Sequence, residues 1–396
     1  MRICVWLERL WPIFFGSSVI VKFYEDRHID TGQVFAIQAV YSCCVVLFDI
    51  PSGHMAVRRG IRFMVIVGSV IQSARAGVFV ISAEFWQFIL VAILTALGWS
   101  FVSGTTNAMM TEQLSQKEYE EEFLPARSDA QVFGSFIGVP LGAVMVWTGG
   151  TLLPFILQPV TFIAALLLAC KLREQQRIHA RGAHPAWREI KSVMRDMLWT
   201  NAHVRWLVIL GAIMSTSLMS FTWLIQPKLL NLGTTPDQLV WLYTLQGTFG
   251  LLIGEFRRLR AKRRIGQPKK PQRELQPYEA FAALIIAVGF IGSLAGTSNG
   301  WPGIAAVLVA PILLRSFAEQ LQSVLLNRIL PDKDKRPVQF SVVSAANNLA
   351  FAIVGMVMGL VLDRHEVNAA LHIVSVCVLW LGGFVLFIAY GTAKKK

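Results

Sequence analysis

The sequence predicts an all-α integral membrane protein with twelve transmembrane helices in two pseudo-symmetric bundles of six. Hydrophobic residues make up 54% of the chain and charged residues only 15%, and the mean hydropathy is +0.53. A chain of this composition is too apolar for an ordinary soluble domain. A helix needs about 20 apolar residues to cross about 30 Å of hydrocarbon. Stretches of that length lie near 4–23, 33–57, 61–82, 86–111, 129–148, 150–171, 204–226, 236–254, 277–296, 302–327, 338–362 and 368–391.

The first apolar run carries Glu8 and Arg9 and lacks an Ala-x-Ala cleavage site. A signal peptide has an apolar centre followed by such a site. We therefore expect residues 4–23 to form the first span.

The 37 lysine and arginine residues indicate how the chain crosses the membrane. Positive residues stay on the cytoplasmic side, from which the chain is inserted. We expect the protein to lie in the cell (inner) membrane with both termini in the cytoplasm. Few lysine and arginine residues then lie away from the cytoplasmic side. They are Lys22, Arg27, Lys228 and Arg364 on the outer side, and Arg9, Arg75 and Arg315 within spans. The net charge of +13 then follows from topology. We expect no nucleic-acid partner, because the basic loops lack a recognisable binding fold.

A long polar interruption separates the first six predicted spans from the last six. It predicts an N-terminal bundle over 1–172, a linker over 173–203 and a C-terminal bundle over 204–396. The linker places apolar side chains at helical spacing, which indicates an amphipathic helix. This helix could lie on the anionic membrane face or pack on the protein's own surface. Its apolar residues are Trp187, Ile190, Val193, Met194 and Met197.

One segment, FDIPSGHMAVRRGIRF at residues 48–63, interrupts the apolar pattern between the second and third spans. Gly53 and Gly60 remove side chains where two helices approach each other and the chain turns. A plain positive anchor would explain the basic residues but not these glycines or Asp49 at their spacings. The basic residues are Arg58, Arg59 and Arg62.

This segment resembles the signature of the major facilitator superfamily of secondary transporters, roughly Gly-x-x-x-Asp-Arg-x-Gly-Arg-Arg. A bacterial drug- and metabolite-type subset precedes the signature with Glu-x-Pro-Thr-Gly, and DIPSG is similar to that motif. The Asp of the signature is replaced by Val57. The resemblance implies two bundles that rock around a central site, with the turn as a gating latch between them. The latch would consist of Gly53, Arg58, Arg59, Gly60 and Arg62.

Three further segments resemble the same superfamily, namely 101–114, 134–143 and 323–364. In the first, the usual acidic pair of the subset is replaced by Thr106 and Asn107. The second, GSFIGVPLGA, is similar to the Gly- and Pro-rich fifth-helix motif associated with antiporters.

Ionisable residues inside spans are costly and are candidates for function. Asp49 is predicted to be a gating or proton-linked carboxylate, or else a structural cap on a neighbouring helix. Arg315 and Glu319 lie four residues apart on one helix face and can pair. They predict either a site where proton and substrate compete, or a permanent structural ion pair. Arg75 has no acid nearby in sequence, and we expect a structural partner on another helix.

Four neutral side chains are further candidates for the wall of a substrate cavity, with interhelical packing as the alternative for each. They are Trp223, Gln246, Asn347 and Asn348.

Motifs for other chemistry are absent from the sequence. We find no Gly-x-x-x-x-Gly-Lys-Ser/Thr phosphate loop, no His-Glu-x-x-His, no Cys-x-x-Cys and no Gly-x-Ser-x-Gly. We therefore expect no enzyme activity, no cofactor and no metal.

The sequence predicts a monomeric secondary transporter whose partners are a small-molecule substrate, protons and the lipid bilayer. The leading hypothesis is proton-coupled export, as an antiporter, of a small amphipathic drug or secondary metabolite. One alternative is proton-coupled uptake of a siderophore-like or nutrient compound, because Arg315 could bind an anionic group. Another is a transport-inactive membrane interaction protein, which the replacements at Val57, Thr106 and Asn107 leave open.

Overall fold

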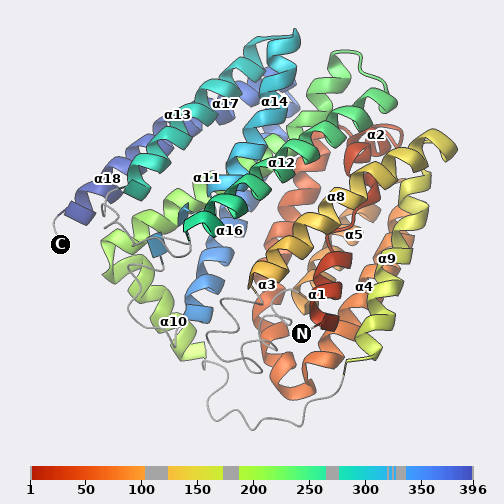
Figure 1. Cartoon of the computed structure of the whole chain (residues 1–396), viewed down its shortest axis with the longest axis horizontal. Helices are drawn as coiled ribbons and strands as arrows, with labels where there is room; N and C mark the ends of the chain where they lie inside the picture. Colours follow the sequence, from red (N-terminus) through yellow and green to blue (C-terminus); the bar gives the residue numbers. More distant parts are fainter. Residues whose placement is uncertain are drawn as a thin grey trace. The chain divides into compact units, whose positions relative to one another are not determined.

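The computed structural model of the chain is all helical in the part that it describes (Figure 1). Inter-residue contacts divide the chain into two compact units, residues 1–184 with 234–247, and residues 185–233 with 248–396. The predicted bundle boundaries at 172 and 204 stay predictions. The structure describes residues 2–102, 124–172, 187–264, 276–318, 321–322, 325–326 and 336–394.

In the first unit, the helices α3, α4, α5 and α9 pack side by side. α4 packs against both α5 and α9, and α3 packs against α5. α1 lies against α8 and α9. The elements are α1 (Arg2–Leu10), the 3₁₀ segment η1 (Phe15–Ser18), α2 (Ile20–Glu25), α3 (Thr31–Arg59), α4 (Ile61–Ile81), α5 (Phe85–Val102), α8 (Leu124–Gly149), α9 (Leu153–Cys170) and the start of α12 (Pro236–Arg264).

The second unit is organised around α11, which packs against α14, α16, α17 and α18. α13 packs against α14 and α17. In the described residues of this unit, three π-helical segments interrupt the α-helices. The elements are α10 (Trp187–Arg195), η3 (Asp196–Thr200), α11 (Ala202–Asn231), the rest of α12, α13 (Gln276–Thr297), α14 (Trp301–Leu313), η4 (Leu314–Ala318), α16 (Arg336–Leu362), α17 (Val367–Cys377), η5 (Val378–Gly382) and α18 (Gly383–Lys394).

Each of the twelve predicted spans contains helix in the described residues. Nine helices there are long and apolar enough to cross a membrane by length and composition. The predicted spans outside those nine are 4–23, 129–148 and 236–254. In the second of these, only Ile137–Gly149 forms an apolar stretch.

The prediction that residues 4–23 form one span-length helix was wrong. α1 ends at Leu10, and turns and the η1 segment separate it from α2. Pro12 lies in this break, and proline has no N–H to continue a helix and collides with the preceding turn. Hydropathy detects the length of an apolar run but does not show whether the helix within it is continuous.

Gln158 of α9 satisfies the backbone groups that the break leaves without helical partners. Its Oε1 accepts a hydrogen bond from the Phe15 N–H at 3.0 Å, and its Nε2 donates to the Ile13 carbonyl at 2.9 Å. The same Nε2 lies 2.9 Å from the Thr161 hydroxyl. Non-helical backbone at membrane depth is tolerated only where protein groups satisfy it in this way.

The face of α8 that meets the broken span is made of glycines at helical spacing, Gly134, Gly138 and Gly142. A Cβ atom at Gly134 or Gly142 would collide with backbone carbonyls of residues 9–15, and one at Gly138 would lie 2.9 Å from a backbone nitrogen there. The glycines thus allow backbone to approach backbone. This contact gives a local structural reason for the segment that resembles the fifth-helix motif.

The predicted amphipathic helix is present as α10, followed by η3. Val193 and Met197 are buried, and α10 packs against α16 of the same unit. Val193 and Met197 therefore follow the second alternative, in which the helix packs on the protein's own surface. Met194 and Trp199 are exposed.

Two polar clusters tie helix ends together in the second unit. Lys228 of α11 is buried and donates to the Oδ1 atoms of Asn299 and Asn368, at 2.8 and 2.6 Å. Near the first residues of α11 and α13, the Tyr278 hydroxyl lies 2.6 Å from Nε2 of the buried His203. These bonds join α11 to α13, α17 and the loop before α14.

Candidate functional site

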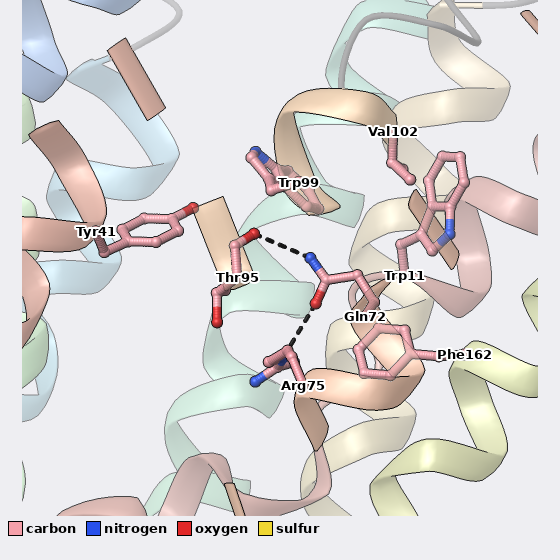
Figure 2. A pocket seen from close by; sticks show the side chains of 8 residues that line it. All are labelled: Trp11, Tyr41, Gln72, Arg75, Thr95, Trp99, Val102 and Phe162. Atoms are coloured by element: carbon pink, nitrogen blue, oxygen red, sulfur yellow. Dashed lines mark hydrogen bonds between the residues drawn. The ribbon is translucent and has the colours of Figure 1, made fainter. Parts of the chain in front are cut away.

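A cavity of about 100 Å³ lies among the helices of the first unit (Figure 2). It draws on the helical break after α1 and on four helices, α3, α4, α5 and α9. Four of its side chains are aromatic and one is cationic. The lining residues are Trp11, Tyr41, Gln72, Arg75, Thr95, Trp99, Val102 and Phe162.

Helical spacing explains why these residues share one cavity. Gln72 and Arg75 are three apart on α4, so they lie on one face of that helix. On α5, Thr95, Trp99 and Val102 follow at intervals of four and three, which also places them on one face. The two faces meet because α4 and α5 pack along their lengths.

A hydrogen-bonded chain crosses the cavity wall, with Gln72 at its centre (Figure 2). Arg75 Nε donates to Gln72 Oε1 at 3.0 Å, and Gln72 Nε2 donates to the Thr95 carbonyl at 3.1 Å. Gly98 of α5 makes room for this amide, because a Cβ there would lie 3.0 Å from Gln72 Nε2. Gln72 is therefore fixed from both sides, and it fixes one edge of the Arg75 guanidinium.

Arg75 is half-buried and belongs to a helix long and apolar enough to span a membrane. Its guanidinium carbon lies 5.4 Å from the centre of the Phe162 ring, a favourable cation–π distance. The phenol groups of Tyr24 and Tyr41 lie within electrostatic range. Among the described residues, no carboxylate forms an ion pair with Arg75. Its hydrogen-bond partner Gln72 is on its own helix, and the partner that another helix supplies is the aromatic ring of Phe162 on α9.

Asp49 lies on α3 two turns beyond Tyr41 and is partly buried. Its carboxyl lies near the Ser100 hydroxyl of α5, which nevertheless makes no hydrogen bond of standard geometry. The Tyr41 phenol is within electrostatic range of both Asp49 and Arg75. Asp49 and the cavity residue Tyr41 thus belong to the same helix.

The residues predicted to form a gating latch occupy the junction of α3 and α4. Gly60 has a φ of +85°, a conformation that side chains other than glycine rarely adopt. Arg62 donates to the Cys170 carbonyl at the end of α9, at 2.9 Å. The Arg59 guanidinium lies 5.6 Å from the Phe63 ring centre. Gly53 lies within α3, and the side chains of Val57 and Arg58 lie outside the described residues.

The predicted pair in the tenth span is only half described. Arg315 lies in the π-helical segment η4 and its side chain is exposed. Glu319 lies outside the described residues. Their pairing stays a prediction.

The four neutral candidates lie on three helices and do not form one described cavity. Trp223 of α11 and Gln246 of α12 are half-buried. Asn348 of α16 donates to the Ser344 carbonyl at 3.0 Å within its own helix. Its neighbour Asn347 has a buried Oδ1 atom without a hydrogen-bond partner in the described part of the chain.

Sequence reasoning missed most of the cavity. Trp11, Tyr41, Thr95 and Trp99 look like ordinary residues of apolar spans. One signal was available, since Gln72 and Arg75 place two polar groups on one helix face within an apolar run.

Membrane-length helices that surround a cavity with a few fixed polar groups are typical of polytopic transport proteins. The sequence matches the family model of the Major Facilitator Superfamily over residues 13–309, so the chain belongs to that superfamily. Its function is transport and not catalysis. The predictions of superfamily and fold class are confirmed.

Two further comparisons agree. The chain is 21% identical over 382 residues to the uncharacterised transporter YxaM of Bacillus subtilis strain 168, covering 92% of this chain and 89% of that protein. The crystal structure of a mutant of the nucleoside transporter NupG superimposes with a TM-score of 0.72 at 13% identity, covering 99% of this chain and 98% of the other. The unmutated NupG gives a TM-score of 0.69 at 12% identity, with 99% and 97% covered. At these identities the crystal structures support the fold alone.

Proposed function

We propose that this protein is a proton-coupled secondary transporter of the bacterial drug- and metabolite-type subset, which exports a small amphipathic organic molecule by alternating access. The observation that carries the proposal is the cavity of the first unit. Aromatic side chains there offer apolar surface, while Arg75, Gln72 and Tyr41 offer polar contacts. Sites for small organic ligands combine mainly apolar walls with a few placed polar groups in this way.

Asp49 is the carboxylate proposed to couple transport to protons. It is partly buried in a span-length helix, and the same helix carries the cavity residue Tyr41. Protonation would remove the negative charge from this helix and so favour its burial in a less polar environment. Coupling through Glu319 beside Arg315, which the sequence predicts, is the other hypothesis, and Glu319 lies outside the described residues.

The broken first span supports a role in conformational change. Trp11 lies in the break and lines the cavity, so movement of α1 relative to η1 would change the cavity wall. Discontinuous helices are common at the binding sites of secondary transporters. We place both termini in the cytoplasm and the protein in the cell membrane on the distribution of positive residues alone.

The direction and coupling are tested with membrane vesicles of both orientations, under an imposed pH gradient. The solutes are benzenesulfonate, uridine and ethidium, which are anionic, neutral and cationic. Export predicts gradient-driven accumulation of a solute in inside-out vesicles only, and the Asp49→Asn variant should lose this accumulation but keep solute exchange.

The alternatives predict different results. Accumulation in right-side-out vesicles would mean uptake. No movement of any solute in either orientation, from vesicles that contain folded protein, would support a transport-inactive interaction protein. Full gradient-driven transport by Asp49→Asn would remove Asp49 from the coupling mechanism.

A further inference from the structure

We infer that the cavity of the first unit binds a compact aromatic organic anion, with Arg75 as the countercharge. The inference rests on the proposed function, in that the bound anion is taken to be the transported solute. It names a substrate class where the proposed function names only an amphipathic molecule. A cation without an ion-pair partner among the described residues, a buried donor without a hydrogen-bond partner there, and the aromatic wall of the cavity carry it.

The first donor is the guanidinium of Arg75. An arginine stays protonated in proteins, so this residue places a full positive charge inside a membrane-length helix. Of its five N–H donors, the one on Nε is bonded to Gln72. In the part of the chain that the structure describes, no carboxylate pairs with the guanidinium. Charged side chains in spans are kept where they meet a partner or a ligand.

The second donor is the indole N–H of Trp11. The side chain is only 9% exposed, and the Nε1 atom is buried without a hydrogen-bond partner among the described residues. Buried polar groups in proteins are nearly always bonded, and each exception calls for an explanation. Trp11 and Arg75 line the same cavity, so a ligand bound there would meet a positive charge and a second hydrogen-bond donor.

Gln72 keeps the arginine available. The amide accepts from Nε and is itself held by the Thr95 carbonyl of α5. Because an amide is neutral, it orients the guanidinium without cancelling its charge. A glutamate at this position would form an internal ion pair, and the natural residue avoids that.

The size and walls of the cavity limit the anion. About 100 Å³ is well below the roughly 300–1,000 Å³ of drug-sized ligand pockets. There is room for an anionic group with about one ring, and Tyr41, Trp99 and Phe162 provide aromatic faces for that ring. A small inorganic anion would pair with Arg75 but would make no contact with these aromatic faces.

The test is equilibrium binding to the purified full-length protein in lipid nanodiscs. Benzenesulfonate is the probe, because it combines one ring with a permanent negative charge. Benzenesulfonamide is the neutral analogue of similar shape. We expect benzenesulfonate to bind at least tenfold more tightly than benzenesulfonamide, and also more tightly than chloride or sulfate. Equal binding of the two ring compounds would overturn the role of charge, and tighter binding of sulfate would overturn the role of the ring.

Three variants assign the effect to residues. Arg75→Gln should weaken benzenesulfonate binding at least tenfold, with little effect on benzenesulfonamide. Gln72→Glu should weaken it as much while leaving the protein folded, because it supplies Arg75 with an internal partner. Trp11→Phe keeps the ring and removes the N–H, and a severalfold weakening is expected. The control for net charge is Arg364→Gln, at an exposed position of the second unit, which should bind as the wild type does.

The outcomes separate this inference from the proposed function. If Arg75→Gln and Gln72→Glu both bind benzenesulfonate as the wild type does, the anion site is refuted, whether or not a solute is transported. If the wild type binds the anion through Arg75 but vesicles move no solute, the site stands and the transport proposal fails. Size-exclusion profiles and thermal midpoints of each variant identify loss of folding, and Gln72→Glu keeps the test decisive if Arg75→Gln is unstable.

Discussion

The break in the first span gives a quantitative prediction about stability. Gln158→Met keeps an unbranched side chain of similar length but removes the hydrogen bonds to the Phe15 N–H and the Ile13 carbonyl, which measure 3.0 and 2.9 Å. A buried backbone group left without a partner costs about 1–3 kcal/mol. The Phe15 N–H is fully buried and the Ile13 carbonyl only partly so. Together they predict a loss of about 2–5 kcal/mol in the free energy of unfolding.

The measurement is reversible unfolding in mixed micelles at rising fractions of denaturing detergent, followed by circular dichroism. The matched control is Gln87→Met. Gln87 also accepts hydrogen bonds from backbone N–H groups, those of Ala83 and Glu84, but at an exposed site. Water replaces these bonds, so the control should lose under about 1 kcal/mol. If Gln158→Met were no less stable than Gln87→Met, the amide would not be what stabilises the break.

Three other variants test neighbouring features, with unfolding measured in the same way. Gly138→Ala should destabilise by about 1–3 kcal/mol through overpacking against backbone, whereas Gly77→Ala, where a Cβ meets nothing within 4 Å, should not; equal effects would contradict the packing account. Arg62→Gln should change stability by under about 1 kcal/mol yet shift the accessibility of engineered cysteines between the two membrane sides. Unchanged accessibility would leave the turn without a latch role. A double-mutant cycle of His203→Phe and Tyr278→Phe should give a coupling of about 1 kcal/mol or more for their 2.6 Å hydrogen bond, and additive effects would contradict it.

Much of the fold could be predicted because a bilayer imposes simple rules. The length of the apolar runs predicted where helices form, and each of the twelve runs contains helix in the described residues. The turn around Gly60 combines glycines with basic residues at the spacing of the superfamily signature. The broken first span could not be predicted in the same way. Its stability depends on Gln158, more than 140 residues away in the sequence, and a single polar residue in an apolar run does not reveal its target.

The candidate site was harder to predict for a related reason. Charge within a span is the signal that a sequence offers, and it points to Asp49, Arg315 and Glu319. The described cavity instead combines aromatic residues from separate helices around Arg75, which the sequence analysis treated as structural. Aromatic side chains occur throughout apolar spans, so only the packing of α3, α4, α5 and α9 against one another shows which of them share a cavity.

Counterflow in proteoliposomes tests the central claim most directly, because it requires both binding and movement across the bilayer but no energy source. Vesicles preloaded with unlabelled benzenesulfonate, uridine or ethidium are diluted into the labelled compound. The account predicts transient accumulation of labelled benzenesulfonate by the wild type and its loss in Arg75→Gln. No accumulation of any of the three compounds, or equal accumulation of benzenesulfonate by wild type and Arg75→Gln, would contradict it.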